Sequence, residues 1–185
     1  MQSAFTLTPD QRERAEALVD PAIDFLQAEG YPLGVAIVRH LWRNGPAEDI
    51  IAALSVYQNA DGGFGNGLEV DIKATVSNPF AARLAMQAMR LVDLDSSAAM
   101  RARLATWLVE NQHEDGDWHF APEVYDGELA PWFAGWTFPS LNPACCVVGN
   151  AIPLEIAPGT MRERVARLFA EKASHDEARS GDFYR

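Results

Sequence analysis

The sequence predicts an all-helical protein that repeats one helix-loop-helix unit. Apolar residues recur at three- and four-residue steps along most of the chain, which is the spacing that lines up on one face of a helix. Clusters of Pro, Gly, Asn and Asp separate these segments, and one turn motif occurs twice in the same order. No extended alternation of apolar and polar residues favours a sheet.

The first helix is expected to begin at Pro9. Thr8 can cap this helix through its hydroxyl, and proline suits the first helical position because its missing N–H would be unpaired there anyway. We expect Pro21 to bend or restart the helix and Gly30 to end it.

Turn residues bound each of the later helices in the same way. Asn-Gly-Pro, Asp-Gly and Asn-Pro sequences stand where the apolar periodicity stops or resumes, and Asn, Asp and Ser are residues that cap helix starts. The predicted helices cover 33–42, 47–58, 79–91, a segment through Met100 to Gln112 that Asp95-Ser96 caps, a segment that begins at Asn142-Pro143, and 160–174.

The segment around Gln58 matches the segment around Gln112 at one offset of 54 residues (112 minus 58). The Asn-Pro helix start after each copy recurs at an offset of 64 (142 minus 78), so the second copy has ten extra loop residues (64 minus 54). This many matches in one order indicate repetition. The matched pairs are Leu54 and Leu108, Gln58 and Gln112, Asp61 and Asp115, Gly62 and Gly116, and Phe64 and Trp118.

The motif residues have structural roles that follow from their chemistry. The Gln side chain can bond the orphan backbone groups at the end of a helix, and the glycine can adopt the left-handed conformation that stops the helix. The aromatic side chain can pack back over the turn. The repeat itself therefore predicts a scaffold and no reaction.

The motif, Leu-x3-Gln-x2-Asp-Gly-x-(Phe/Trp), resembles the repeats of the terpenoid cyclase and protein prenyltransferase superfamily over roughly residues 47–153. The run from Gln58 to Asp71 also resembles bacterial members of that superfamily that have no assigned reaction. The resemblance implies an α/α toroid of inner and outer helices, in which the Gln and aromatic residues of the motif brace the barrel. Phe64 departs from the Trp that the family usually has at this position.

We expect one toroid-like domain over 1–185, because a chain of 185 residues with 48% hydrophobic and 22% charged residues can supply one ordinary core. Complete toroids of the superfamily close with more helix pairs than the sequence predicts here. The expected fold is therefore an all-α toroid or a partial, truncated one. Its open edge would be covered by a missing C-terminal part, by a second copy in a homo-oligomer, or by another partner.

The composition excludes several classes of partner. The formal net charge is −11 and no basic run offsets it, so binding to nucleic acid or to an anionic membrane surface is not expected. No apolar segment is long enough to span a membrane, and the N-terminus lacks a signal-peptide pattern. The adjacent Cys145 and Cys146 would point apart on a helix, and free cysteines fit a reduced, cytoplasmic setting.

The reactions known in the resembled superfamily lack their usual residues here. Asp93-Leu94-Asp95-Ser96 lacks the final Asp of the acid motif of class II terpene cyclases and is better explained as a helix cap. No Asp-x-Cys pattern supports the zinc site of prenyltransferases, and no Asp-Asp-x-x-Asp run supports a magnesium-diphosphate site. We therefore predict no metal site and no cofactor from these motifs.

Two carboxylates, Glu69 and Asp71, follow the first Gly-rich turn two residues apart. In an extended loop they would lie on one side, where they could hold a divalent cation or act as acid and base beside Lys73. The alternative is a solvated loop or a helix cap, as for most charged loops. Glu69 and Asp71 are the first candidates for catalysis.

The longer loop of the second repeat, 117–138, concentrates aromatic and acidic residues. This mixture could line a pocket for an apolar, cationic or sugar-like ligand, or the aromatics could simply hold the loop down. His119 is a candidate general base for catalysis, with a structural hydrogen-bonding role as the alternative. The candidate ligand-binding residues are Trp118, Glu123, Tyr125, Asp126, Trp132 and Trp136.

Three functions are compatible with this sequence. The first is a protein of terpenoid cyclase and prenyltransferase type that binds or transforms an apolar or isoprenoid ligand in a helix-lined cavity. The second is a carbohydrate-processing α/α toroid enzyme that uses paired carboxylates. The third is a non-catalytic scaffold that binds a protein. The resemblance favours the first, although a fold by itself does not fix a reaction.

Overall fold

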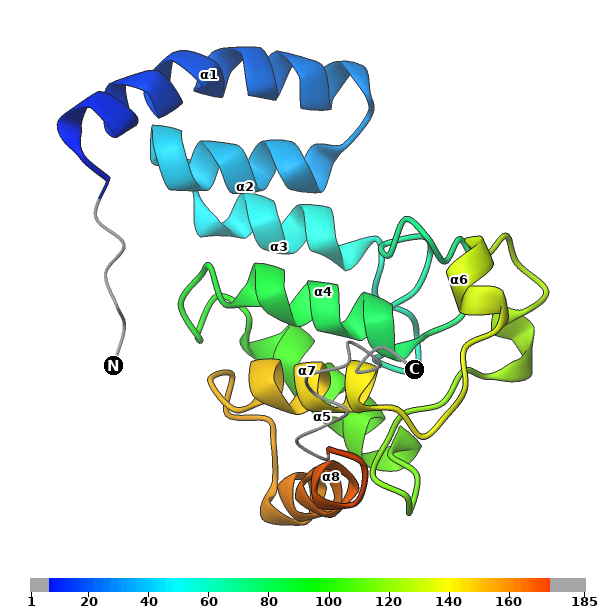
Figure 1. The fold of residues 1–185 in the computed structure, drawn as a ribbon. Helices are drawn as coiled ribbons and strands as arrows, with labels where there is room; N and C mark the ends of the chain where they lie inside the picture. The colour runs from blue at the N-terminus through cyan, green and yellow to red at the C-terminus, as the bar shows by residue number, and fades with distance from the viewer. Residues whose placement is uncertain (1–6, 174–185) are drawn as a thin grey trace. The chain divides into compact units, whose positions relative to one another are not determined.

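The structure is a computed structural model, and it describes residues 7–173. Within that range the protein has eight α-helices, one short 3-10 helix and no β-strand, so the predicted all-helical class is confirmed (Figure 1). The helices are α1 (Pro9–Ala28), α2 (Pro32–Arg43), α3 (Ala47–Ser55), α4 (Pro79–Met89), α5 (Ala98–Asn111), η1 (Pro122–Val124), α6 (Pro131–Ala134), α7 (Leu141–Ala151) and α8 (Gly159–Lys172).

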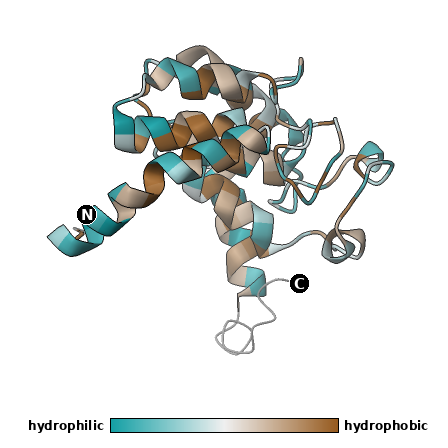
Figure 2. Cartoon of the chain, turned by 90° about the horizontal axis from the view of Figure 1, so that it is seen from above, coloured by the Kyte–Doolittle hydropathy of each residue, from teal (hydrophilic) through white to brown (hydrophobic). Residues whose placement is uncertain are grey.

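The chain divides into two compact units, which we call unit 1, ending at Ala53, and unit 2, beginning at Leu54. The expectations of one domain and of a toroid stay predictions. Most helices carry both hydrophilic and hydrophobic bands, as helices with one buried face must (Figure 2). None of the described helices combines the length and hydropathy needed to cross a membrane.

In unit 1, α1 and α2 run antiparallel and share a small apolar core built on Val19, Ile23 and Val35 (Figure 1). The predicted cap at Thr8 is confirmed, because the Thr8 hydroxyl accepts from the N–H of Gln11 at 3.2 Å while the Gln11 side chain accepts from the N–H of Thr8.

Pro21 does not restart the first helix, because α1 continues as one helix through this residue. The alternative of a bend at Pro21 stays a prediction. A proline removes one helical hydrogen bond, which here leaves the carbonyl of Ala17 without its partner. Pro21 and Ala17 are both exposed, so water can bond that carbonyl and the helix tolerates the proline.

In unit 2, α4 packs against α7, and α7 packs against α8. The broad apolar face that the sequence predicts for α4 is buried, and Asn78 caps this helix by accepting from the N–H of Ala81 at 2.9 Å. The start of α5 differs from the prediction. Ser97 precedes the helix without a side-chain cap, and Asp93 instead accepts from the N–H of Ser96 at 2.8 Å, a bond that lowers the pKa of Asp93.

The two copies of the repeat motif have equivalent surroundings. The Gln58 side chain donates from Nε2 to the carbonyl of Gly62, at 2.9 Å, and to that of Met100 in α5, at 3.1 Å. The Gln112 side chain donates to the carbonyl of its own motif glycine, at 3.1 Å, and to that of Met161 in α8, at 3.2 Å. Gln58 therefore ties its turn to α5, and Gln112 ties its turn to α8. The bracing of a barrel, which the resemblance implies, stays a prediction.

The acidic residue of the motif closes each turn in the same way. Asp61 Oδ1 accepts from the N–H of Gly63 at 2.9 Å, and Asp115 Oδ1 accepts from the N–H of Asp117 at 3.0 Å. The aromatic residues Phe64 and Trp118 are both fully buried at the ends of their turns. The repeat predicted from the sequence is thus a repeat of structure.

The motif glycines bring each turn close to a helix further along the chain, α5 for Gly62 and α8 for Gly116. Gly62 and Gly116 have φ angles of 92° and 97°, a left-handed conformation that favours glycine. A Cβ atom on Gly62 would lie 2.4 Å from the carbonyl oxygen of Arg103, and one on Gly116 would lie 2.6 Å from that of Arg164. These positions therefore need glycine for its conformation and for its size.

Candidate functional site in the loops of unit 2

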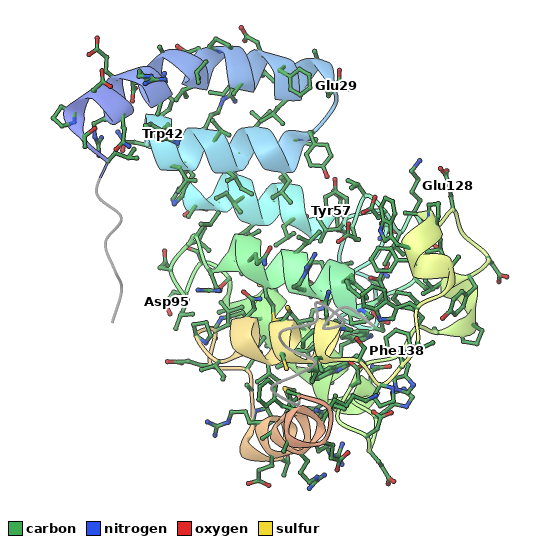
Figure 3. The ribbon with its side chains drawn as sticks, in the orientation of Figure 1. Glu29, Trp42, Tyr57, Asp95, Glu128 and Phe138 are labelled. Carbon is green, nitrogen blue, oxygen red and sulfur yellow. The ribbon has the colours of Figure 1, made fainter. Side chains whose placement is uncertain are left out.

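The connecting loops of the two repeats meet in unit 2, and we call residues 65–77 and 117–139 together the loop cluster. Backbone hydrogen bonds join the loops: the N–H of Lys73 donates to the carbonyl of Glu128 at 3.0 Å, and the N–H of Ala130 donates to that of Asp71 at 2.9 Å. The cluster lies beyond the N-terminal ends of α4 and α7, where Glu128 and Phe138 mark it (Figures 1 and 3).

An aromatic core holds the loop cluster together. Phe80, from the first turn of α4, contacts the rings of Phe120, Phe133 and Trp136, with centroid distances of 5.7, 4.7 and 5.2 Å. Tilted and edge-to-face contacts of this kind stabilise beyond the area that they bury. The aromatics of the second loop therefore do hold that loop down, as one of the two interpretations of the sequence requires.

Glu69 is buried in the loop cluster and pairs with Arg83 of α4. Its Oε2 lies 3.1 Å from a terminal nitrogen of Arg83, and the side chains are 10% and 24% exposed. The guanidinium also lies over the Phe80 ring, with Cζ 5.8 Å from the ring centroid. This ion pair is therefore shielded on one side by an aromatic face, where the attraction between its charges is stronger than in water.

Asp71, the second predicted acid, is half-buried and lies beside Glu69. Its N–H donates to Glu69 Oε1 at 3.4 Å, and Lys73, the expected charge partner, instead pairs with the exposed Glu128 at 3.1 Å. Across residues 7–173, no group of three or more His, Cys, Asp or Glu side chains is placed to hold a metal ion.

The predicted ligand-binding residues occupy two kinds of position. Trp118 is buried, and its indole N–H donates to the carbonyl of Leu108 at 2.9 Å, as in a scaffold. Trp136 is half-buried against Phe80, and its buried Nε1 has no acceptor within the described chain. The exposed members are Glu123, Tyr125, Asp126 and Trp132, and the Trp132 side chain is the most open of the loop aromatics at 60%.

His119 belongs to a stack of three rings at the edge of the loop cluster. His113 lies on one side of it at a centroid distance of 3.9 Å, and Phe138 lies on the other at 4.9 Å. Its Nε2 is 2.8 Å from Asp115 Oδ2, although the two groups do not align as a hydrogen bond. The candidate base thus has a carboxylate neighbour, and the same carboxylate closes the repeat turn.

Asp117 is a buried acid that the sequence reasoning did not single out. Its Oδ1 accepts from the N–H of Trp118 at 2.8 Å, and its Oδ2 accepts from the N–H of Ser140 at 2.7 Å. Burial raises the pKa of Asp117 to about 7, although the two N–H groups act in the opposite direction. The sequence does contain a signal for Asp117, because the matched position of the first repeat is Gly63, so the two copies of the turn differ there by an acidic side chain.

Asp117→Asn is expected to reduce the dependence of stability on pH. The folded pKa of Asp117 is raised, so folding favours its protonated form, and its contribution to stability is full below pH 4 and is lost as pH rises through about 7. Relative to the Asn variant, the wild-type free energy of unfolding should therefore fall by a few kcal/mol over this window. Urea denaturation of both proteins at pH 5 and pH 8 measures the difference, and an unchanged or opposite difference would show that the carboxylate stays ionised.

Comparison of the chain with models of protein families, with curated proteins and with solved structures finds no match to any of the three. The loop cluster and the repeat are therefore interpreted from their own geometry.

Proposed function

We propose that the loop cluster binds an apolar ligand of isoprenoid type that carries an oxygen-containing head group. One observation carries this proposal: Trp136 and Arg83 both contact the Phe80 ring, and each has a buried N–H, at Nε1 and at Nε, with no acceptor among the described residues. An unsatisfied buried donor costs about 1–3 kcal/mol, so a ligand oxygen that accepts from either group would bind favourably.

The surroundings of these donors suit such a ligand. The half-buried ring of Trp136 offers an apolar surface to a hydrocarbon chain, and the shielded pair of Glu69 and Arg83 offers a polar edge to an alcohol or phosphate. Phe120 and Phe133 pack tightly inside the cluster, so the ligand would bind at its rim, where the side chains of Tyr125 and Trp132 are 47% and 60% exposed.

The resemblance of the repeat to the terpenoid cyclase and prenyltransferase superfamily supports the same class of ligand. The carbohydrate alternative requires two carboxylates that are free to act on the substrate. Glu69 is engaged by Arg83 and by the N–H of Asp71, which argues against that use of this residue. The protein-binding alternative stays a prediction.

Titration with farnesol, followed by NMR of the tryptophan indole N–H groups, tests this proposal. We expect the Trp136 signal to shift on addition of farnesol, and we expect Trp136→Phe to weaken binding by about tenfold, the loss of about one buried hydrogen bond. Trp42→Phe, in unit 1, is the matched control and should bind as the wild type does.

Three results would contradict the proposal. The first is unchanged farnesol affinity in Trp136→Phe, because the indole N–H would then contribute nothing. The second is the absence of any farnesol binding by the wild type. The third is preferential binding of maltotriose, which would favour the carbohydrate alternative.

A further inference from the structure

A groove of about 720 Å³ lies within unit 1 and is lined by residues of α1, α2 and α3. This volume falls in the range of about 300–1,000 Å³ that is typical of small-molecule sites. Apolar or small residues supply most of its lining, among them Val35, Ala36 and Ala53, and three polar side chains, Gln27, Arg39 and Asp49, also line it. The groove is independent of the loop cluster, because every residue that lines it belongs to unit 1.

The groove arises partly because the turn after α1 is short. Like the motif of unit 2, this turn has a Gln near the end of the helix and a left-handed glycine, Gly30, with a φ of 68°. The next helix begins at Pro32, so no long loop follows (the turn is marked by Glu29 in Figure 3). A Cβ on Gly62 would meet the backbone of α5 and one on Gly116 that of α8, whereas a Cβ on Gly30 would meet nothing within 4 Å.

The groove arises also because α3 lacks bulk at one position. The offset of 54 residues places Ala53 of α3 opposite Trp107 of α5. Trp107 is 5% exposed, and its ring would lie 2.6 Å from a Cβ on Gly63, so it fills the space against the turn of the first repeat. Alanine at 53 leaves the corresponding space in unit 1 open.

The same offset of 54 residues pairs two residues of opposite charge, Asp49 in α3 and Arg103 in α5. Arg103 of α5 donates to the carbonyl of Asn59 at 2.6 Å and so holds the turn of the first repeat. The matched residue in α3 is Asp49, whose carboxylate can accept hydrogen bonds but cannot donate to a carbonyl. A ligand in the groove of unit 1 must therefore donate a hydrogen bond to Asp49. In the turn of the first repeat the roles are reversed, because a backbone carbonyl accepts from Arg103.

Arg39 and Asp49 both line the groove without pairing with each other. Neither side chain makes an ion pair or hydrogen bond within the described residues, so each charge is available to a ligand. The groove adjoins a second hollow of about 350 Å³, and the two share Gln27, Arg39 and Asp49 in their linings. Asp24 also lines that hollow, which favours a cationic group beside Asp49. Arg43, which also lines that hollow, is already paired with Glu16 and Asp20.

We propose that the groove of unit 1 binds a small apolar zwitterion of dipeptide size. The ammonium group of the ligand lies at Asp49, its carboxylate lies at Arg39, and its apolar side chains lie against Val35, Ala36 and Ala53. Charge-assisted hydrogen bonds at Asp49 and at Arg39 fix the orientation, and burial of the apolar side chains supplies the remaining affinity.

Isothermal titration of the full chain with the dipeptide leucyl-phenylalanine tests this inference. The free dipeptide should bind, and its N-acetyl and C-terminal amide derivatives should each bind at least about tenfold more weakly, because each derivative removes one charge-assisted hydrogen bond worth more than about 1.4 kcal/mol. Equal affinity of all three compounds, or no binding of the free dipeptide, would overturn the proposal.

Variants in α3 locate the site. Asp49→Asn should weaken binding of the free dipeptide by about tenfold, and Glu48→Gln, which removes the same charge from the neighbouring residue, should leave binding unchanged. Ala53→Trp introduces the residue that α5 has at this position and should abolish binding. Ala53→Leu provides a smaller filling residue if the Trp variant does not fold.

Thermal melting of each variant shows whether unit 1 remains folded. Undiminished dipeptide binding by a folded Ala53→Trp or Ala53→Leu protein would overturn the proposal. Competition between farnesol and the dipeptide would do so as well, because it would place the dipeptide in the loop cluster of unit 2.

Discussion

Gly62→Ala and Gly116→Ala are each expected to destabilise unit 2 by about 2–5 kcal/mol. Part of this cost is conformational, because φ angles of 92° and 97° are strained for a residue that has a Cβ. The rest is steric, because the new Cβ would lie 2.4 Å from a backbone carbonyl oxygen of α5 or 2.6 Å from one of α8, and that oxygen cannot move without shifting its helix. Urea denaturation followed by circular dichroism measures the loss.

Gly67→Ala is the matched control for these substitutions. Gly67 also has a positive φ, 74°, but a Cβ on it would meet nothing within 4 Å, so this variant should show the conformational cost alone, about 1–2 kcal/mol. If Gly62→Ala and Gly67→Ala lost the same free energy of unfolding, the turn at Gly62 would not approach α5 as described.

Trp118→Ala is expected to destabilise unit 2 by about 3–5 kcal/mol. The side chain is fully buried, so alanine leaves a large cavity, and the carbonyl of Leu108 also loses its hydrogen bond from the indole N–H. Trp118→Phe should cost much less, because Phe64 fills the equivalent place in the first repeat. Equilibrium denaturation in urea compares the two variants with the wild type.

Trp132→Ala controls for the loss of a tryptophan as such. Its side chain is 60% exposed, so its removal should change the free energy of unfolding by no more than about 0.5 kcal/mol. A comparable loss in Trp118→Ala and Trp132→Ala would contradict the assignment of Trp118 to the scaffold.

The helices and the repeat could be predicted from the sequence because their signals are local. Thr8 and Asn78 cap their helices by bonding residues only three positions away, and the motif from Gln58 to Phe64 closes its turn largely upon itself. A restart of the helix at Pro21 was a wrong alternative, because the effect of a proline depends on whether its helix face meets solvent, which the local pattern does not specify.

The candidate site could be predicted only in part, because long-range pairing creates it. Glu69 was identified by its residue type, but its partner Arg83 lies on a different element, and a loop sequence does not reveal which helix it will meet. The pairing of the two loops, through Asp71 and Ala130, likewise joins segments far apart in the chain. Asp117 had a signal in the mismatch with Gly63, which distinguishes the two copies of an otherwise matching turn.

Hydrogen exchange of the glutamine side-chain amides, measured by NMR, tests most directly whether the first turn is bonded to α5 and the second to α8. The Nε2 group of Gln58 and that of Gln112 each donate to two carbonyls, so both should exchange far more slowly than that of the exposed Gln87. Gln112, which is 9% exposed, should be the slower of the two. Exchange of either amide as fast as that of Gln87 would show that its turn is not bonded to α5 or to α8. That result would contradict the repeat as a structural unit.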